Sequence, residues 1–159
     1  MSIQVETKDC TALGDAELAE LADLCAEGPL PYEVGVISKQ AEAWVLVTQA
    51  RENGKLKGFS FSTLERIGGT PSVLIGCASI KRTSKRDSVL RAIIQDELRR
   101  AVLAFPDEDV LVGTRFTTPA GFEPAGPVRA DVSHLGQLRV AELGAVLGRD
   151  LDSHVLYSP

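Results

Sequence analysis

The sequence predicts an α/β (α+β) domain in which helices flank a central sheet. Residues 44–64 read as two strands joined by a turn, residues 73–80 form a nearly continuous apolar run, and residues 88–105 repeat apolar side chains at helical spacing. A hairpin, a buried strand and a long amphipathic helix in this order are typical of a sheet covered by helices.

Length and composition indicate one globular domain over residues 1–159. The chain is 44% hydrophobic and 25% charged, with a formal charge of −5 at pH 7. A chain of this length buries about 70% of the surface that its unfolded form exposes, so we expect it to fold without a disulfide frame or a structural metal. Its longest uncharged stretch, residues 67–80, spans about 14 residues, fewer than the roughly 20 apolar residues of a membrane helix. The N-terminus resembles neither a secretory nor a transit signal, which predicts a cytoplasmic protein without a membrane partner.

The charge balance and the cysteines exclude two further classes. A sequence pI near 5.1 argues against general nucleic-acid binding, which needs a basic face. The three cysteines, Cys10, Cys25 and Cys77, form no metal-ligand or disulfide spacing, and we interpret Cys25 and Cys77 as small core residues.

The first half of the chain is predicted to form two helices and a hairpin. Asp15 is the expected N-cap of an amphipathic helix that ends at Gly28 and Pro29, and a short helix follows over 38–43. Residues 44–49 and 56–64 are the expected strands of the hairpin, with Trp44 at the start of the first strand and a turn at residues 53–54.

The second half is predicted to begin with a strand over 73–80 that is buried on both faces and central in the sheet. A basic loop leads from it to a helix that starts at Ser88 and ends at residues 105–106. A strand over 109–115, a helix over 135–147 and a short strand over 155–157 complete the expected elements.

The basic loop is the most distinctive chemical feature. Four of the 17 basic residues, Lys81, Arg82, Lys85 and Arg86, fall within six positions between a buried strand and a long helix. The first amides of a helix lack partners within it and lie at the positive end of its dipole, so this junction suits a phosphate group. Lysine and arginine add charge, and arginine adds bidentate hydrogen bonds. A solvated basic loop without a ligand is the alternative interpretation.

The segment ASIKRTSKRDSVLRAII resembles the loop with which GNAT N-acetyltransferases bind acetyl-CoA between their fourth strand and third helix. In an ungapped comparison, Ile80 takes the place of the family's valine and Lys85 that of its arginine, while Arg86, Ser88 and Leu90 stand at its three glycine places. The order of elements and Gly58 in the third strand also fit, and residues 121–123 resemble the family's late LGFE stretch. The resemblance implies a mixed, mostly antiparallel sheet.

The resemblance also implies a function: transfer of an acyl group from acetyl-CoA, or another acyl-CoA, to a small-molecule or peptide amine. The expected donor-binding residues come from the end of the central strand and from the loop and helix start that follow: Ala78, Ser79, Ile80, Lys85, Arg86, Asp87, Ser88, Val89 and Leu90. The candidate base is Glu65, with a surface carboxylate as the alternative, and the candidate acid is Tyr157, with a tyrosine that only packs as the alternative. A shortened C-terminal part predicts a homodimer through an uncovered sheet edge. The alternative function is a catalytically degenerate ligand-binding or protein-interaction module.

Other catalytic signatures are missing from the sequence. It contains no GxSxG elbow, no GxxxxGK[ST] loop and no GxGxxG, and its two histidines, His134 and His154, have no zinc-ligand spacing. We therefore expect no metal cofactor. Arg115, at the end of the strand over 109–115, is expected either in a structural salt bridge or opposite an acidic group of a ligand.

Overall fold

The computed structural model describes residues 2–27, 32–83 and 85–114. They form a five-stranded sheet of order β1-β2-β3-β4-β5, antiparallel throughout except for the parallel β4–β5 pair. The strands are β1 (Gln4–Asp9), β2 (Leu46–Glu52), β3 (Lys55–Ile67), β4 (Thr70–Ile80) and β5 (Leu111–Thr114), and the helices are η1 (Cys10–Ala12), α1 (Asp15–Ala26), α2 (Val34–Ala43) and α3 (Arg86–Ala104). The predicted α+β class, with its mixed, mostly antiparallel sheet, is confirmed.

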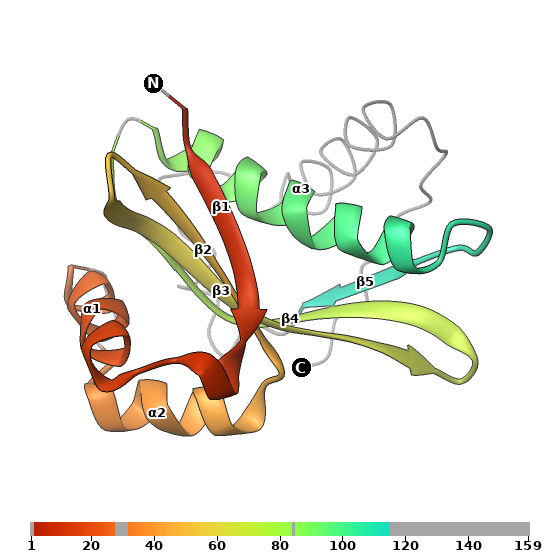
Figure 1. Ribbon diagram of the computed structural model, residues 1–159, viewed down its shortest axis with the longest axis horizontal. Coiled ribbons are helices and arrows are strands. Elements are labelled where there is room, and N and C mark those ends of the chain that lie inside the picture. The colour runs from red at the N-terminus through yellow and green to blue at the C-terminus, as the bar shows by residue number, and fades with distance from the viewer. Residues whose placement is uncertain (1, 28–31, 84, 115–159) are drawn as a thin grey trace, which may run out of the picture.

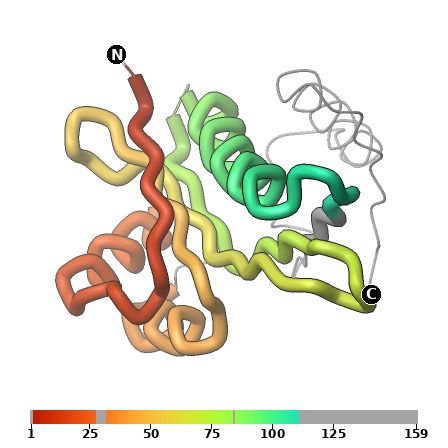
Figure 2. The backbone as a smooth tube through the Cα atoms, turned by 45° about the vertical axis from the view of Figure 1, so that its right-hand side comes forward, coloured from red at the N-terminus to blue at the C-terminus, as the bar shows by residue number. Residues whose placement is uncertain are grey.

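Helices cover both faces of the sheet (Figure 1). On one face α1 and α2 pack over Val47, Phe59 and Phe61, which are fully buried. On the opposite face α3 packs through Val89 and Ile93 against Ala50. Figure 2 shows the same separation from a second direction, with α3 across the sheet from α1 and α2. This two-sided cover explains why β3 alternates large aromatic with small side chains: the aromatics fill the α1/α2 side, whereas glycine and serine admit α3.

Several predicted boundaries were wrong. The strand β1 was not predicted, because it is a polar edge strand with a short alternation pattern. The helix α2 begins four residues earlier than predicted. Trp44 does not open a strand but ends α2, where its backbone N–H bonds to the Gln40 carbonyl at 3.0 Å. The N-cap of α1 is Gly14, whose N–H is accepted by the Glu17 carboxylate at 3.2 Å, so Asp15 is the first helical residue. The long helix, α3, begins at Arg86, two residues before Ser88.

The burial of β4 also differs from the prediction. The strand lies inside the sheet, between β3 and β5, but β3 is the central strand. The first half of β4 is buried, whereas Ala78 near its end is exposed. The predicted helix over 135–147, the strand over 155–157, residues 121–123, Arg115 and both histidines lie outside the described residues. No described helix is long and apolar enough to cross a membrane.

Candidate functional site

The geometry of the candidate site begins with a β-bulge in β4. Ser60 pairs with Ala78 and Ser62 pairs with Ile75, so Phe61 alone lies opposite both Gly76 and Cys77. A bulge of this kind changes the direction of a strand and is often found beside active sites. The Trp44 ring lies against it: a Cβ atom built on Gly76 would stand 2.2 Å from Trp44 Cζ2. Only glycine therefore fits the bulge at this position.

Beyond the bulge, β4 turns part of its backbone away from β3. The N–H of Lys81 donates to the Lys57 carbonyl at 2.8 Å, which shows that this residue bonds toward β3. Successive residues of an antiparallel strand alternate in direction, so the N–H and C=O groups of Ile80 and Ala78 point to the opposite edge. The β4–β5 pairing that the structure describes covers Ser72–Ile75 only. Within the described residues, the outer edge of β4 after Ile75 thus has no strand partner.

This edge leads directly to the N-terminus of α3. The first i to i−4 bond of the helix joins the Val89 N–H to the Lys85 carbonyl at 3.0 Å, and the Arg86 N–H bonds to Thr83 O at 3.1 Å. The amides of Asp87 and Ser88 therefore precede the first intrahelical bond, at the positive end of the dipole. The strand edge and the helix end are separated by the basic loop, in which the Lys81, Thr83 and Arg86 amides already have hydrogen-bond partners.

Two of the four basic side chains at this junction already meet carboxylates. Lys85 Nζ bonds to Glu52 Oε1 at 2.5 Å, and Lys81 Nζ lies 3.3 Å from Glu27 Oε1. The Lys85 ammonium group holds the pKa of the Glu52 carboxyl below its usual value. Figure 1 shows the reason: the β2–β3 turn lies beside the start of α3. The loop is thus a mixed-charge surface rather than a purely basic one.

The remaining predicted donor-site residues lie at different depths. Asp87 and Ser88 are exposed, whereas Val89 is buried against the sheet and anchors the first turn of α3. The Ser79 side chain hydrogen-bonds the Cys25 thiol, on the side of the sheet that α1 covers. Burial of Cys25, and of Cys77 beside it, raises the pKa of both thiols, that of Cys77 to about 12, as small core residues require.

The candidate catalytic residues are not brought to this edge by the described chain. Glu65 is exposed and pairs with Ser72, on the far side of the bulge from Ala78, and Tyr157 lies outside the described residues. No group of three or more His, Cys, Asp and Glu side chains in the described parts of the chain is arranged to hold a metal ion.

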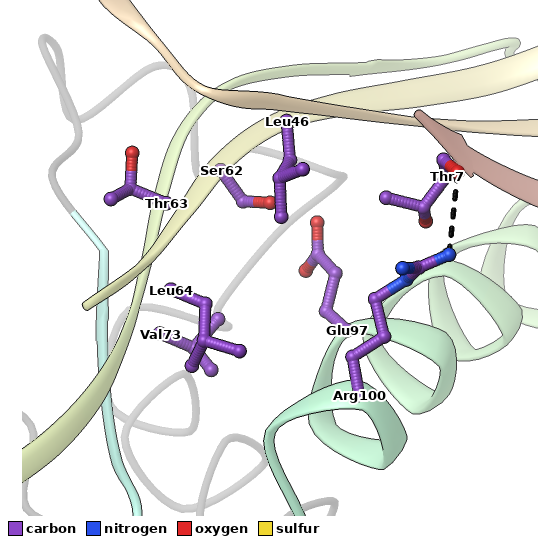
Figure 3. A pocket seen from close by; sticks show the side chains of 8 residues that line it. All are labelled: Thr7, Leu46, Ser62, Thr63, Leu64, Val73, Glu97 and Arg100. Carbon is purple, nitrogen blue, oxygen red and sulfur yellow. Dashed lines mark hydrogen bonds between the residues drawn. The ribbon is translucent and has the colours of Figure 1, made fainter. Parts of the chain in front are cut away.

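Glu97, whose carboxyl group has the most perturbed pKa among the described acidic residues, is not among the candidates that the sequence motifs predict. Glu97 of α3 is 4% exposed, accepts a hydrogen bond from Ser60 Oγ at 2.8 Å, and leaves Oε2 without a partner. Burial raises the pKa of Glu97 to about 7. Figure 3 shows the side chain pointing from α3 toward the sheet at the edge of a small cavity. A signal was present, because Glu97 continues the buried i, i+4 row of Val89 and Ile93.

Comparison with known proteins supports the fold. No protein-family model and no curated protein matches the sequence. Solved structures do match. An aminoglycoside N-acetyltransferase in complex with CoA matches with a TM-score of 0.55 and 12% identity, over 99% of this chain and 94% of that one. An acyl-CoA N-acyltransferase from Pseudomonas aeruginosa matches with a TM-score of 0.52 and 18% identity, over 70% of this chain and 78% of that one. A ribosomal-protein-alanine N-acetyltransferase from Brucella melitensis biovar Abortus 2308 matches with a TM-score of 0.51 and 14% identity, over 72% of this chain and 82% of that one.

These structures define the class of fold. The chain has the fold of the GNAT N-acetyltransferases, as the resemblance of its strand-loop-helix segment implied.

Proposed function

We propose that this protein is an acyl-CoA-dependent N-acyltransferase that transfers an acyl group to a small-molecule or peptide amine. The proposed donor is acetyl-CoA or another acyl-CoA. One feature carries the proposal: the backbone groups of Ala78 and Ile80 face an edge of β4 that has no strand partner within the described residues, and a short basic loop joins this edge to the N-terminus of α3. Matched solved structures include N-acetyltransferases, one of them in complex with CoA.

The residues present fit an acyl-CoA molecule. Its pantetheine arm carries amides that would pair with Ala78 and Ile80 as an added strand does. Its pyrophosphate would accept hydrogen bonds from the amides of Asp87 and Ser88, and Lys85 and Arg86 would supply positive charge. Acyl-CoA supplies the activated thioester. A backbone N–H beside the bulge would stabilise charge that develops on the thioester oxygen.

Proton transfer is assigned to two candidates. Tyr157 is the proposed acid for the leaving thiolate, and Glu65 is the weaker candidate for the base, because Ser72, its partner on β4, precedes the bulge by several residues. Activity of Tyr157→Phe and Glu65→Gln, measured as release of the CoA thiol, tests each role. Unchanged kcat in either variant removes that residue from the mechanism.

Donor binding is tested by thermal unfolding with and without CoA and acetyl-CoA. A ligand that binds only the folded state at 100 times its Kd stabilises by about 2.7 kcal/mol. This corresponds to a rise of roughly 5–10 °C in Tm for a chain of this size. We expect the double variant Lys85→Ala, Arg86→Ala to weaken binding about tenfold or more, because it removes two charge-assisted contacts.

A matched control removes the same charge elsewhere. Lys39 and Arg99 are exposed on α2 and α3, away from the junction, so Lys39→Ala, Arg99→Ala should keep the ligand-induced shift. Equal loss in both double variants would indicate nonspecific electrostatics, and no shift in the wild type at millimolar CoA would refute the proposal. The proposed homodimer is tested separately by light scattering, where a monomer mass at all concentrations excludes it.

A further inference from the structure

A cluster of hydroxyl groups lies between α3 and the sheet, on the face opposite α1 and α2. It consists of Thr7, Thr48, Ser60 and Ser62, and we call it the hydroxyl cluster. Thr48, Ser60 and Ser62 are each no more than 3% exposed, and Thr7 Oγ1 lies 2.8 Å from Thr48 Oγ1. Three adjacent strands, β1, β2 and β3, therefore contribute polar groups to an interface that is apolar elsewhere along α3.

The partner of this cluster on α3 is the Glu97 carboxyl group. Oε1 accepts from Ser60 at 2.8 Å, and the hydroxyl groups of Thr48 and Ser62 also lie close to the carboxyl group. Oε2 is buried and lacks a partner among the described residues, although it lies beside a small cavity. A buried carboxylate with an unpaired oxygen is costly, because nothing replaces the water that it loses.

Charged groups near Glu97 do not neutralise it. Asp96, its neighbour, accepts from Thr7 Oγ1 at 2.6 Å and repels a second negative charge. Arg100 lies at the cavity but directs its guanidinium group to the Thr7 carbonyl at 3.3 Å (Figure 3). The guanidinium group also lies 3.5 Å from Asp96 Oδ2. From β1, β2 and β3 only hydroxyl groups reach the carboxyl group. A proton would neutralise Glu97 without any further charged partner.

We propose that protonation of Glu97 stabilises the packing of α3 against the sheet. The neutral acid fits the hydroxyl cluster and the carboxylate does not. The packing of α3 therefore weakens as the pH rises toward neutrality. Hydroxyl oxygens can accept from the acid O–H and can also donate to its carbonyl, which satisfies both oxygens. This inference goes beyond the proposed function and does not depend on it, because the candidate donor site uses the first turn of α3, whereas Glu97 lies further along the helix.

The direction of the pH effect follows from linkage. The pKa of Glu97 is raised from 4.5 to about 7 in the folded state, so the unfolded chain releases its proton first as the pH rises. The stability of the fold is therefore greatest below pH 4.5 with respect to this group, falls between pH 4.5 and 7, and is constant above. Over pH 5 to 8 the folding equilibrium constant should decrease roughly 100-fold through this one group.

The test compares urea unfolding of the wild type and Glu97→Gln at pH 5 and pH 8, followed by far-UV circular dichroism. The amide of glutamine mimics the neutral acid, so we expect the variant to lose most of the wild-type decrease and to be the more stable protein at pH 8. Glu42→Gln removes an exposed carboxylate from α2 and should retain the wild-type decrease. Since the same background groups titrate in all three proteins, the difference between them isolates Glu97.

Three results would overturn the proposal. The first is an unchanged pH dependence in Glu97→Gln, and the second is equal destabilisation of that variant at both pH values. The third is that Na⁺ or K⁺, added at constant ionic strength, restores at pH 8 the stability that the wild type has at pH 5. This result would identify a bound cation in place of the proton. If the variant does not fold, infrared detection of a protonated buried carboxyl in the wild type at pH 6 decides, and its absence refutes the proposal. Failure of CoA binding would leave these results unaffected.

Discussion

Gly76→Ala tests the contact between the β4 bulge and the Trp44 ring. The added Cβ atom would lie 2.2 Å from Trp44 Cζ2, 2.3 Å from Cε2 and 2.8 Å from Nε1, all far inside van der Waals contact. The ring cannot retreat without strain, because Nε1 donates to Gln40 Oε1 at 3.1 Å and the ring packs on the α1/α2 core cluster. Overpacking of this kind costs about 1–3 kcal/mol.

The magnitude includes an opposing contribution from the unfolded chain. Gly76 does not have a positive φ, so alanine can adopt its backbone conformation and gains about 0.4–1 kcal/mol by restricting the unfolded state. We therefore expect a net loss of about 1–2 kcal/mol, measured by urea unfolding with far-UV circular dichroism. Because Trp44 is the single tryptophan, its fluorescence should report the displaced ring in the same sample.

Two controls make the explanation refutable. Gly35 lies in α2 with nothing within 4 Å of a built Cβ atom, so Gly35→Ala should stabilise the protein by about 0.5–1 kcal/mol. In the double variant with Trp44→Leu, the penalty of Gly76→Ala should largely disappear, since the clashing ring is gone. A Gly76→Ala variant as stable as Gly35→Ala, or an unchanged penalty in the Trp44→Leu background, would contradict the proposed contact.

Three further predictions use other contacts. A Cβ atom on Gly58 would meet Val89 Cγ1 at 2.9 Å, so Gly58→Ala should destabilise the protein by about 1–2 kcal/mol, and Val89→Ala should reduce this penalty in a double-mutant unfolding cycle. Arg51 forms a bidentate ion pair with Glu20 and lowers the pKa of that carboxyl group. Arg51→Met should therefore reduce the free energy of unfolding by about 0.5–1 kcal/mol above pH 4.5, and by progressively less as the pH falls through the lowered pKa. Urea unfolding at a series of pH values measures this difference. The pKa of about 12 at Cys77 predicts alkylation by iodoacetamide on the order of 1,000-fold slower than that of free cysteine at pH 8, and rapid labelling of the native protein would contradict its burial.

Local patterns were sufficient to predict most elements near the candidate site. Alternation and turn residues predicted the hairpin, and the apolar spacing of α3 predicted its long packed face, because both signals depend on neighbours in sequence. The basic run after β4 likewise marked the strand-to-helix junction. Sequence alone did not predict β1, whose short polar strand is stabilised by pairing with β2 and by contacts between Thr7 and α3.

The tertiary structure decided which of these residues act on one another. The pairing register placed the bulge at Gly76 and turned Ala78 and Ile80 outward, whereas the sequence shows only a continuous apolar run. Helix packing buried Glu97, although the spacing from Val89 and Ile93 alone does not show which groups of the sheet the carboxyl group meets. The sequence thus indicated most of the elements, since their signals are local, but register, burial and charge pairing depend on residues that are distant along the chain. Those long-range contacts create the strand edge and the buried Glu97 carboxyl group from which the two proposals follow.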